Sequence, residues 1–252
     1  MSDQADTANF HIVRYHQAWM EDDRLYIQTE LCSGTLTDEM NRIPPVLNVA
    51  RRYKLLREIL LALDFIHRYN MVHLDIKPDN IFIKNDQYKL GDFGLVTKAS
   101  CSQDVEEGDS RYISMELLSG DKRSDLTKSD IFSLGITMYE ICLGRQLPMN
   151  GEEWQDIRAG KLSPLPNTHH DMANIIKRML EPNPMNRPTP ASLLKHPQLL
   201  SDEEKALNAE RTKVIHANIQ LAAQQQMHYG VPLPKRALTR ANTWSGSSLP
   251  YV

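Results

Sequence analysis

One stretch of the chain brings a carboxylate, an amine and an amide together within six residues. The run HLDIKPDN begins at His73, and the triplet DFG begins at Asp92, twelve residues after Asn80. Asp75 is an acceptor-only carboxylate that can orient a hydroxyl, and Lys77 can place a positive charge beside a transferring anion. Asn80 and Asp92 carry hard oxygen atoms of the kind that Mg²⁺ prefers. These residue types suit phosphoryl transfer, which depends on positioning and charge neutralisation.

Strands and turns are expected to hold these residues in place. Strand-like runs surround the two motifs at 71–74, 80–84 and 88–92. Residues 10–32 alternate about an acidic turn and predict a hairpin. An apolar period of three to four residues predicts a helix that starts near Val46 and ends near Asn70. A second apolar helix is expected over 125–144, ended by Gly144. Shorter helices are expected at 151–159, 170–180 and 189–195.

Composition narrows the class of protein. The 252 residues carry 29 Lys and Arg against 32 Asp and Glu, a net charge of −3 that disfavours a generic nucleic-acid binder. No apolar run approaches the ~18–20 residues of a membrane span, and the first ten residues do not resemble a secretory signal. The three cysteines lie far apart, which disfavours a disulfide scaffold or a zinc site. We expect a soluble intracellular protein.

The two motifs, in this order and at this spacing, resemble the catalytic loop and the metal-binding triplet of eukaryotic protein kinases. The resemblance implies an α+β, protein-kinase-like fold with a mostly helical C-lobe and only a remnant of the strand-rich N-lobe. It also implies ATP and Mg²⁺ as cofactors.

The resemblance assigns roles to individual residues. Asp75 would be the catalytic base and Lys77 would neutralise the transferring group, while Asn80 and Asp92 would hold the metal. Phe82 would lie beneath the adenine. Thr29 would be the gatekeeper of the adenine pocket, with backbone groups of Glu30 and Cys32 meeting the adenine edge. The residues with structural roles would be His73, Phe93, Glu116, Asp130 and Arg187.

The activation segment distinguishes the kinase group. Gly108, Asp109, Arg111 and Tyr112 stand in the run EGDSRY, which resembles the corresponding segment of the Wee-type mitosis-inhibitory kinases. This resemblance implies phosphorylation of a tyrosine in a mitotic cyclin-dependent kinase, in the nucleus, delaying entry into mitosis. Lys77 alone would instead favour serine or threonine as the acceptor, and Asp109 is the residue that argues for tyrosine. Phe93 departs from the leucine more common in the Wee group.

Elements that a kinase needs for its phosphates do not appear ahead of the expected hinge. The first glycine is Gly34 and the first lysine is Lys54, so a Gly-rich loop and a strand lysine cannot be placed before Thr29. We therefore expect a kinase domain that begins after its regulatory helix. Three hypotheses follow: the C-terminal portion of an active Wee-type kinase, a catalytically inactive docking module, or a serine/threonine kinase.

The expected domain organisation has four parts. Residues 1–10 are expected to be disordered, and 11–200 form the kinase domain, with an N-lobe remnant and hinge at 11–35 and a C-lobe at 36–200. A polar helix is expected over 201–229, opened by the capping-box pair Ser201 and Glu204. Its Leu207, Val214 and Leu221 recur every seven residues, a weak coiled-coil pattern. A disordered tail is expected over 230–252.

Two regulatory features are also expected. Thr243 follows Arg240 by three residues, so a phosphate there could be read by a 14-3-3-type partner. Leu74 replaces the arginine that binds an activation-loop phosphate in many kinases, so phosphorylation at Ser100, Ser102 or Ser110 should not be needed for activity. Nucleic acid and membrane are not expected as partners.

Overall fold

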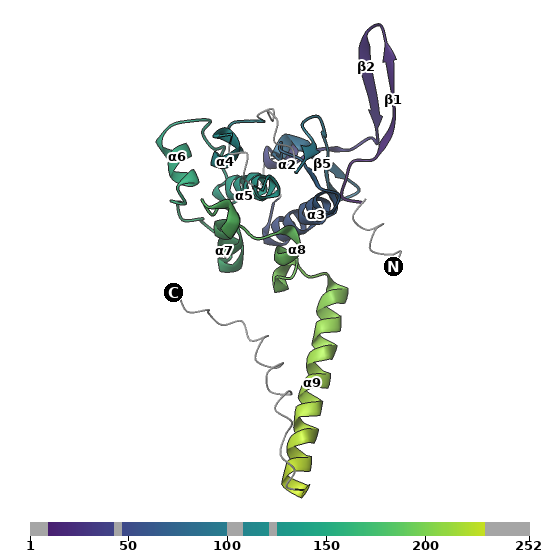
Figure 1. The fold of residues 1–252 in the computed structure, drawn as a ribbon, viewed down its shortest axis with the longest axis vertical. Helices are drawn as coiled ribbons and strands as arrows, with labels where there is room; N and C mark the ends of the chain where they lie inside the picture. Colours follow the sequence, from purple (N-terminus) through teal and green to yellow (C-terminus); the bar gives the residue numbers. More distant parts are fainter. Residues whose placement is uncertain (1–9, 43–46, 100–107, 121–124, 230–252) are drawn as a thin grey trace. The chain divides into compact units, whose positions relative to one another are not determined.

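A computed structural model describes residues 10–42, 47–99, 108–120 and 125–229. The chain divides into two compact units, Met1–Leu199 and Leu200–Val252 (Figure 1). Disorder was expected for residues 1–10 and 230–252, and of these only Phe10 is among the described residues. Thr243, Ser100 and Ser102 also lie outside the described residues.

Within the described residues of the first unit, the strands form three small antiparallel sheets, ordered β1-β2, β3-β5-β6 and β4-β7. The strands are β1 (Tyr15–Glu21), β2 (Arg24–Thr29), β3 (Gly34–Thr35), β4 (Met71–Val72), β5 (Ile81–Lys84), β6 (Gln87–Leu90) and β7 (Thr97–Lys98).

The same unit contains more helical residues than strand residues. They are α2 (Leu36–Met40), α3 (Val49–Arg68), α4 (Met115–Leu118), α5 (Thr127–Leu143), α6 (Glu152–Arg158), α7 (His170–Met179) and α8 (Pro190–Leu193). Short 3₁₀ turns lie at η1 (Pro78–Asn80), η2 (Pro184–Asn186) and η3 (Pro197–Leu199). The helical content and small sheets are those of an α+β kinase-like fold, as the sequence predicts.

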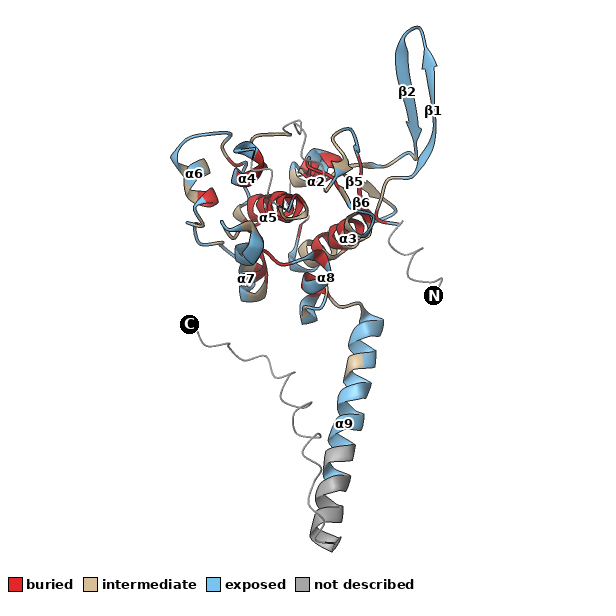
Figure 2. Ribbon diagram, viewed as in Figure 1, coloured by how far each residue is buried: buried red, intermediate tan, exposed pale blue. Residues whose placement is uncertain are grey.

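The core lies between α3 and α5, which Figure 2 shows as the most deeply buried helices. Helix α3 begins after Asn48, whose side chain accepts a hydrogen bond from Arg51 N at 3.0 Å, and buries one apolar face. Helix α5 is buried along almost its whole length, which explains why apolar residues are not confined to one face of it. It ends at Gly144, whose φ of 70° is the left-handed conformation that glycine adopts most readily.

The β1–β2 hairpin is confirmed, and every residue of both strands is exposed (Figure 2). Tyr15 and Ile27 are 59% and 61% exposed, as expected for a strand pair without an apolar cover. An N-lobe that is only a remnant predicts that Ile12 is unburied as well, and this prediction is wrong. Its backbone bridges Leu90 of β6 and its side chain packs partly against the core, because the strand edge of β6 is free to pair there.

The second unit contains helix α9 (Asp202–Tyr229). The capping box is present: Glu204 N donates to Ser201 Oγ at 3.1 Å, and Ser201 N donates to Glu204 Oε2 at 2.6 Å. Leu207 and Val214 are about half exposed, so this unit gives them no apolar cover within the described residues. Along the described part of the chain, none of the helices has the length and apolar character needed to cross a membrane.

Candidate active site

Asp75 lies in the loop between β4 and η1, at the centre of a polar cluster. Lys77 Nζ donates to both of its carboxylate oxygens, at 2.8 and 3.0 Å. Asn80 Nδ2 donates to Asp75 Oδ2 and to the Asp75 backbone oxygen, both at 2.8 Å. The Asp75 side chain remains 10% exposed, so a hydroxyl can still reach it. The structure thus brings together three of the four residues expected to act on the phosphoryl group.

Asp130, near the start of α5, holds the backbone of this loop. Its two carboxylate oxygens accept from His73 N at 2.9 Å and from Leu74 N at 2.8 Å, and the side chain is fully buried. Leu74 has a φ of 67°, a conformation that costs a bulky residue stability and persists only where surrounding contacts enforce it. Asp130 supplies those contacts, and His67 Nε2 lies 2.8 Å from the same carboxylate.

His73 connects the loop to the DFG triplet. Its Nε2 lies 3.0 Å from Gly91 O and its Nδ1 accepts from Asp75 N at 3.3 Å, a pattern that assigns the neutral ring with the proton on Nε2. Complete burial lowers the pKa of His73, which keeps the ring neutral. The Phe93 ring packs edge-on against it, with centroids 5.1 Å apart. This contact with His73 fits the structural role expected of Phe93.

Asp92 and Asn80 provide oxygen atoms suited to a divalent cation. Asp92 is exposed with a φ of 57°, and the backbone nitrogen of Gly91 donates to Asn80 O at 2.9 Å, which ties the two segments together. Both hydrogen bonds of the Asn80 amide nitrogen go to Asp75, so its side-chain oxygen is the atom left for a cation. One carboxylate and one amide oxygen fit Mg²⁺, which usually takes few protein ligands beside phosphates and water.

The start of the described activation segment touches the base. Asp109 N donates to Asp75 Oδ1 at 3.4 Å. A Cβ at Gly108 would stand 2.7 Å from Asp75 Oδ1, so only glycine allows this close approach. The Asp109 carboxylate turns toward Arg111, accepting from its backbone nitrogen at 2.9 Å and lying 3.5 Å from its Nη1.

Tyr112 anchors the same segment to α5. Its hydroxyl donates to Glu140 Oε2 at 2.6 Å, in a buried environment that raises the pKa of both groups. Ser133 Oγ donates to the Tyr112 backbone oxygen at 2.9 Å. The sequence did not single out Glu140, because a glutamate within an apolar helix carries no signal of its partner.

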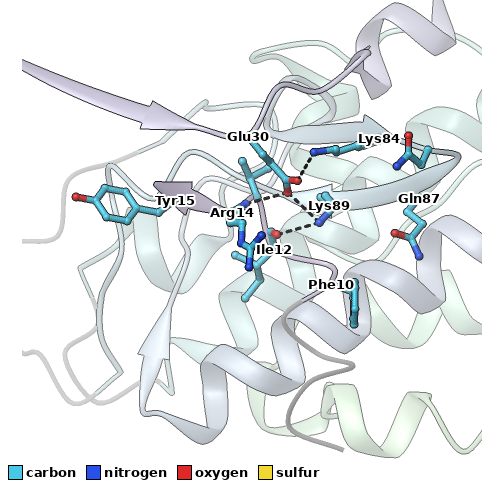
Figure 3. A pocket seen from close by; sticks show the side chains of 10 residues that line it. Phe10, Ile12, Arg14, Tyr15, Glu30, Lys84, Gln87 and Lys89 are labelled. Carbon is cyan, nitrogen blue, oxygen red and sulfur yellow. Dashed lines mark hydrogen bonds and ion pairs between the residues drawn. The ribbon is translucent and has the colours of Figure 1, made fainter. Parts of the chain in front are cut away.

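The expected hinge is tied to the β5–β6 hairpin through Glu30 (Figure 3). Its carboxylate accepts from Lys84 Nζ at 2.7 Å, Lys89 Nζ at 2.9 Å and Arg14 N at 2.9 Å. These residues line a cavity of about 710 Å³ that also includes Phe10. Burial alone would raise the pKa of Glu30, but the two lysines and the Arg14 amide hold it at about 2.

The other hinge residues are less enclosed. Thr29 ends β2 and is exposed, whereas Cys32 is half-buried and burial raises the pKa of its thiol. Ser33 N donates to Ile83 O at 2.7 Å, which brings the hinge to β5. Phe82 lies on that strand, half-buried and opposite Lys89. The adenine-binding roles of these residues stay predictions.

The hydrogen bonds and ion pairs of Glu30 make the folding stability depend on pH in the acid range. The folded pKa of about 2 lies below the ordinary 4.5, so the stabilisation is present above about pH 4.5 and is lost as pH falls toward 2. We expect the difference in unfolding free energy between wild type and Glu30→Gln to be constant from pH 5 to 7 and to shrink below pH 4.5. Urea titrations across this range measure it, with Glu203→Gln, an exposed site on α9, as control. A difference that stays constant down to pH 2.5 would contradict the prediction.

Glu116 and Arg187 form a buried ion pair at the base of the activation segment. Arg187 Nη2 donates to Glu116 Oε2 at 3.0 Å, its Nη1 contacts Oε1, and Ser129 Oγ donates to Oε1 at 3.0 Å. Burial would raise the pKa of Glu116, but Arg187 holds it below its usual value. The pair contacts neither Asp75 nor Asp92, which fits the structural role expected of it.

Comparisons with known proteins place the chain. A family model described as "Protein kinase domain" matches residues 4–199. The chain is 44% identical over 187 residues to a Wee1-like protein kinase of Oryza sativa subsp. japonica, covering 74% of this chain and 35% of the relative. It is 40% identical over 190 residues to a Wee1-like protein kinase of Arabidopsis thaliana, covering 75% and 38%. It is 35% identical over 273 residues to Wee1-like protein kinase 1-B of Xenopus laevis, covering 92% and 45%.

The chain therefore spans between a third and a half of the length of these curated relatives. The family match covers the catalytic loop, the DFG triplet and the Glu116–Arg187 pair described above. On this evidence the chain belongs to the protein kinase family, and within that family it is similar to the Wee type.

Proposed function

We propose that this chain carries the catalytic residues of an ATP-dependent kinase that phosphorylates a tyrosine of a mitotic cyclin-dependent kinase and so delays entry into mitosis. The observation that carries the proposal is the orientation of Asp109. Its carboxylate faces Arg111, and only its backbone nitrogen approaches Asp75. The side-chain hydroxyl that serine/threonine kinases place between the base and Lys77 is missing, which changes the space and hydrogen bonding offered to an acceptor.

The side chains support an in-line transfer. The acceptor hydroxyl oxygen forms a bond to the γ-phosphorus, the bond from that phosphorus to the bridging oxygen breaks, and ADP leaves. Asp75 orients the hydroxyl and accepts its proton, while Lys77, which already contacts Asp75, neutralises the transferring group. Asn80 and Asp92 would hold Mg²⁺, which neutralises phosphate charge when bound.

A second candidate is a docking module without catalysis. The exposed apolar side chains of the β1–β2 hairpin favour it, because Met20, Leu25 and Ile27 are all more than 60% exposed and could pack against another protein. In that case the C-lobe surface would still bind a cyclin-dependent kinase. A nuclear location and a 14-3-3-type reader of phosphorylated Thr243 belong to the proposal in either form.

The experiment supplies the elements that precede the hinge. In a chimera, the residues of the rice relative that lie upstream of its match are joined to this chain. We expect the chimera to place phosphate on tyrosine of a recombinant cyclin-dependent kinase that has been inactivated by mutation, and phosphoamino-acid analysis measures this. Phosphoserine and phosphothreonine alone would favour the serine/threonine alternative. Binding of the same protein without any transfer would favour the docking module.

A further inference from the structure

Helix α6 carries a buried arginine whose partners are main-chain carbonyls. Arg158 is 4% exposed. Its Nη2 donates to the carbonyls of Ser110 at 3.1 Å, Arg111 at 3.0 Å and Ile113 at 2.7 Å, and its Nε donates to Ile113 O at 3.0 Å. Burial lowers its pKa to about 9, with no carboxylate nearby in the described residues to offset the effect, and the guanidinium stays protonated at neutral pH.

Trp154, one turn earlier on α6, completes this contact. The Arg158 guanidinium carbon lies 3.6 Å from the centroid of the Trp154 ring, which is a close cation–π stack. The indole Nε1 donates to Ser110 O at 2.9 Å, the same carbonyl that Arg158 binds. Residues four apart lie on one helix face, so the two side chains act on the segment together.

The segment held in this way leads directly from the base. Gly108 and Asp109 touch Asp75, and the carbonyls bound by α6 begin at the next residue, Ser110. Burying a cation without a counter-charge costs stability, so general stability alone would be served better by an apolar side chain. The contribution of Arg158 is geometric: its planar guanidinium, which has several N–H donors, fixes the path of a backbone segment that has no regular secondary structure.

We propose that Arg158 and Trp154 are positioning residues for the polypeptide substrate. They hold the backbone of residues 110–113, which continues directly from Gly108 and Asp109 beside Asp75. By this proposal, a polypeptide whose hydroxyl lies at Asp75 runs beside that backbone. The proposal rests on the proposed kinase activity. It assigns α6 to recognition of the polypeptide and gives it no role in binding ATP or in the transfer itself.

Comparing phosphate transfer to protein with ATP hydrolysis distinguishes recognition of the polypeptide from ATP binding and transfer, because hydrolysis of ATP needs no polypeptide. In the chimera, Arg158→Met should lower kcat/KM for the inactivated cyclin-dependent kinase about tenfold to a hundredfold. The KM for ATP and the rate of ATP hydrolysis should stay within about twofold of wild type. Arg158→Lys should give a kcat/KM for the protein substrate between those of wild type and Arg158→Met, since an ammonium cannot bridge the same carbonyls. Arg178→Met, at an exposed site on α7, is the matched control and should change none of these values.

Hydrogen exchange on residues 1–252 gives a second measurement. Arg158→Met should speed exchange of the amides of residues 109–113 while those of α5 stay protected. If Arg158→Met does not fold, Trp154→Phe is the second variant, because it keeps an aromatic ring beside the guanidinium and removes the donor to Ser110 O. It should lower kcat/KM for the protein substrate several-fold, again without changing ATP hydrolysis. Equal losses of transfer to protein and to water would overturn the positioning role, as would unchanged kcat/KM. A wild-type chimera that transfers phosphate to no protein would instead refute the proposed function.

Discussion

Replacing Arg187 with alanine should lower the free energy of unfolding by about 3–5 kcal/mol. The substitution leaves the Glu116 carboxylate buried without its cation, and it also removes the donors to Glu181 O at 2.7 Å and Pro182 O at 3.1 Å. The carboxylate side chain is only 5% exposed, so water cannot readily replace the guanidinium. Urea unfolding at pH 7 measures the loss.

Two variants test whether the unpaired charge is the cause. Arg178→Ala removes an exposed arginine from α7 and should change stability by no more than about 0.5 kcal/mol. The double variant Glu116→Leu with Arg187→Met removes both charges and should be more stable than Arg187→Ala, because no charge is left buried alone. A double variant as unstable as Arg187→Ala would show that packing and the carbonyl contacts account for the effect.

The helices and the catalytic loop could be predicted because their signals are local. The apolar period of α3, the left-handed cap at Gly144 and the capping box at Ser201 each depend on residues within a few positions of one another. The HLDIKPDN run likewise contains Asp75, Lys77 and Asn80, so a single turn of chain brings them into contact.

Contacts between distant segments carried no such signal. The partners of Arg158 in the activation segment lie 45 to 48 residues away, and they are backbone carbonyls, which every residue type offers. The Glu30 cluster joins the hinge to lysines 54 and 59 positions later. Ile12 was expected to be unburied because only a remnant of the N-lobe was predicted, whereas its backbone bridges Leu90 and its side chain packs partly against the core. In each case the deciding partner is far along the chain.

The second large effect concerns residues 1–252 without any added segment. Figure 2 shows β1 and β2 exposed on both faces, and among the described residues ahead of the hinge there is neither a lysine nor a glycine to contact phosphates. Phosphate charges would then meet mostly water, where a charge contact at 4 Å is worth only about 1 kcal/mol. We expect residues 1–252 to transfer phosphate at least about 10³-fold more slowly than the chimera, since one preorganised donor alone can contribute about 10²–10³.

A radiolabel transfer assay measures both proteins at equal concentration, and calorimetry measures how tightly each binds ATP. Asp75→Asn in the chimera sets the background, because the amide cannot accept the acceptor proton, and its nitrogen cannot accept the hydrogen bonds that one carboxylate oxygen now receives. Residues 1–252 should fall near that background although Asp75, Asn80 and Asp92 are all in place. Turnover by residues 1–252 that Asp92→Asn abolishes would mean that other side chains of this chain neutralise the phosphates. Asn80 and Asp92 would then provide a functional metal site without a strand lysine. The first substitutions to test would be at Lys84 and Lys89, which lie on the β5–β6 hairpin and contact the hinge through Glu30.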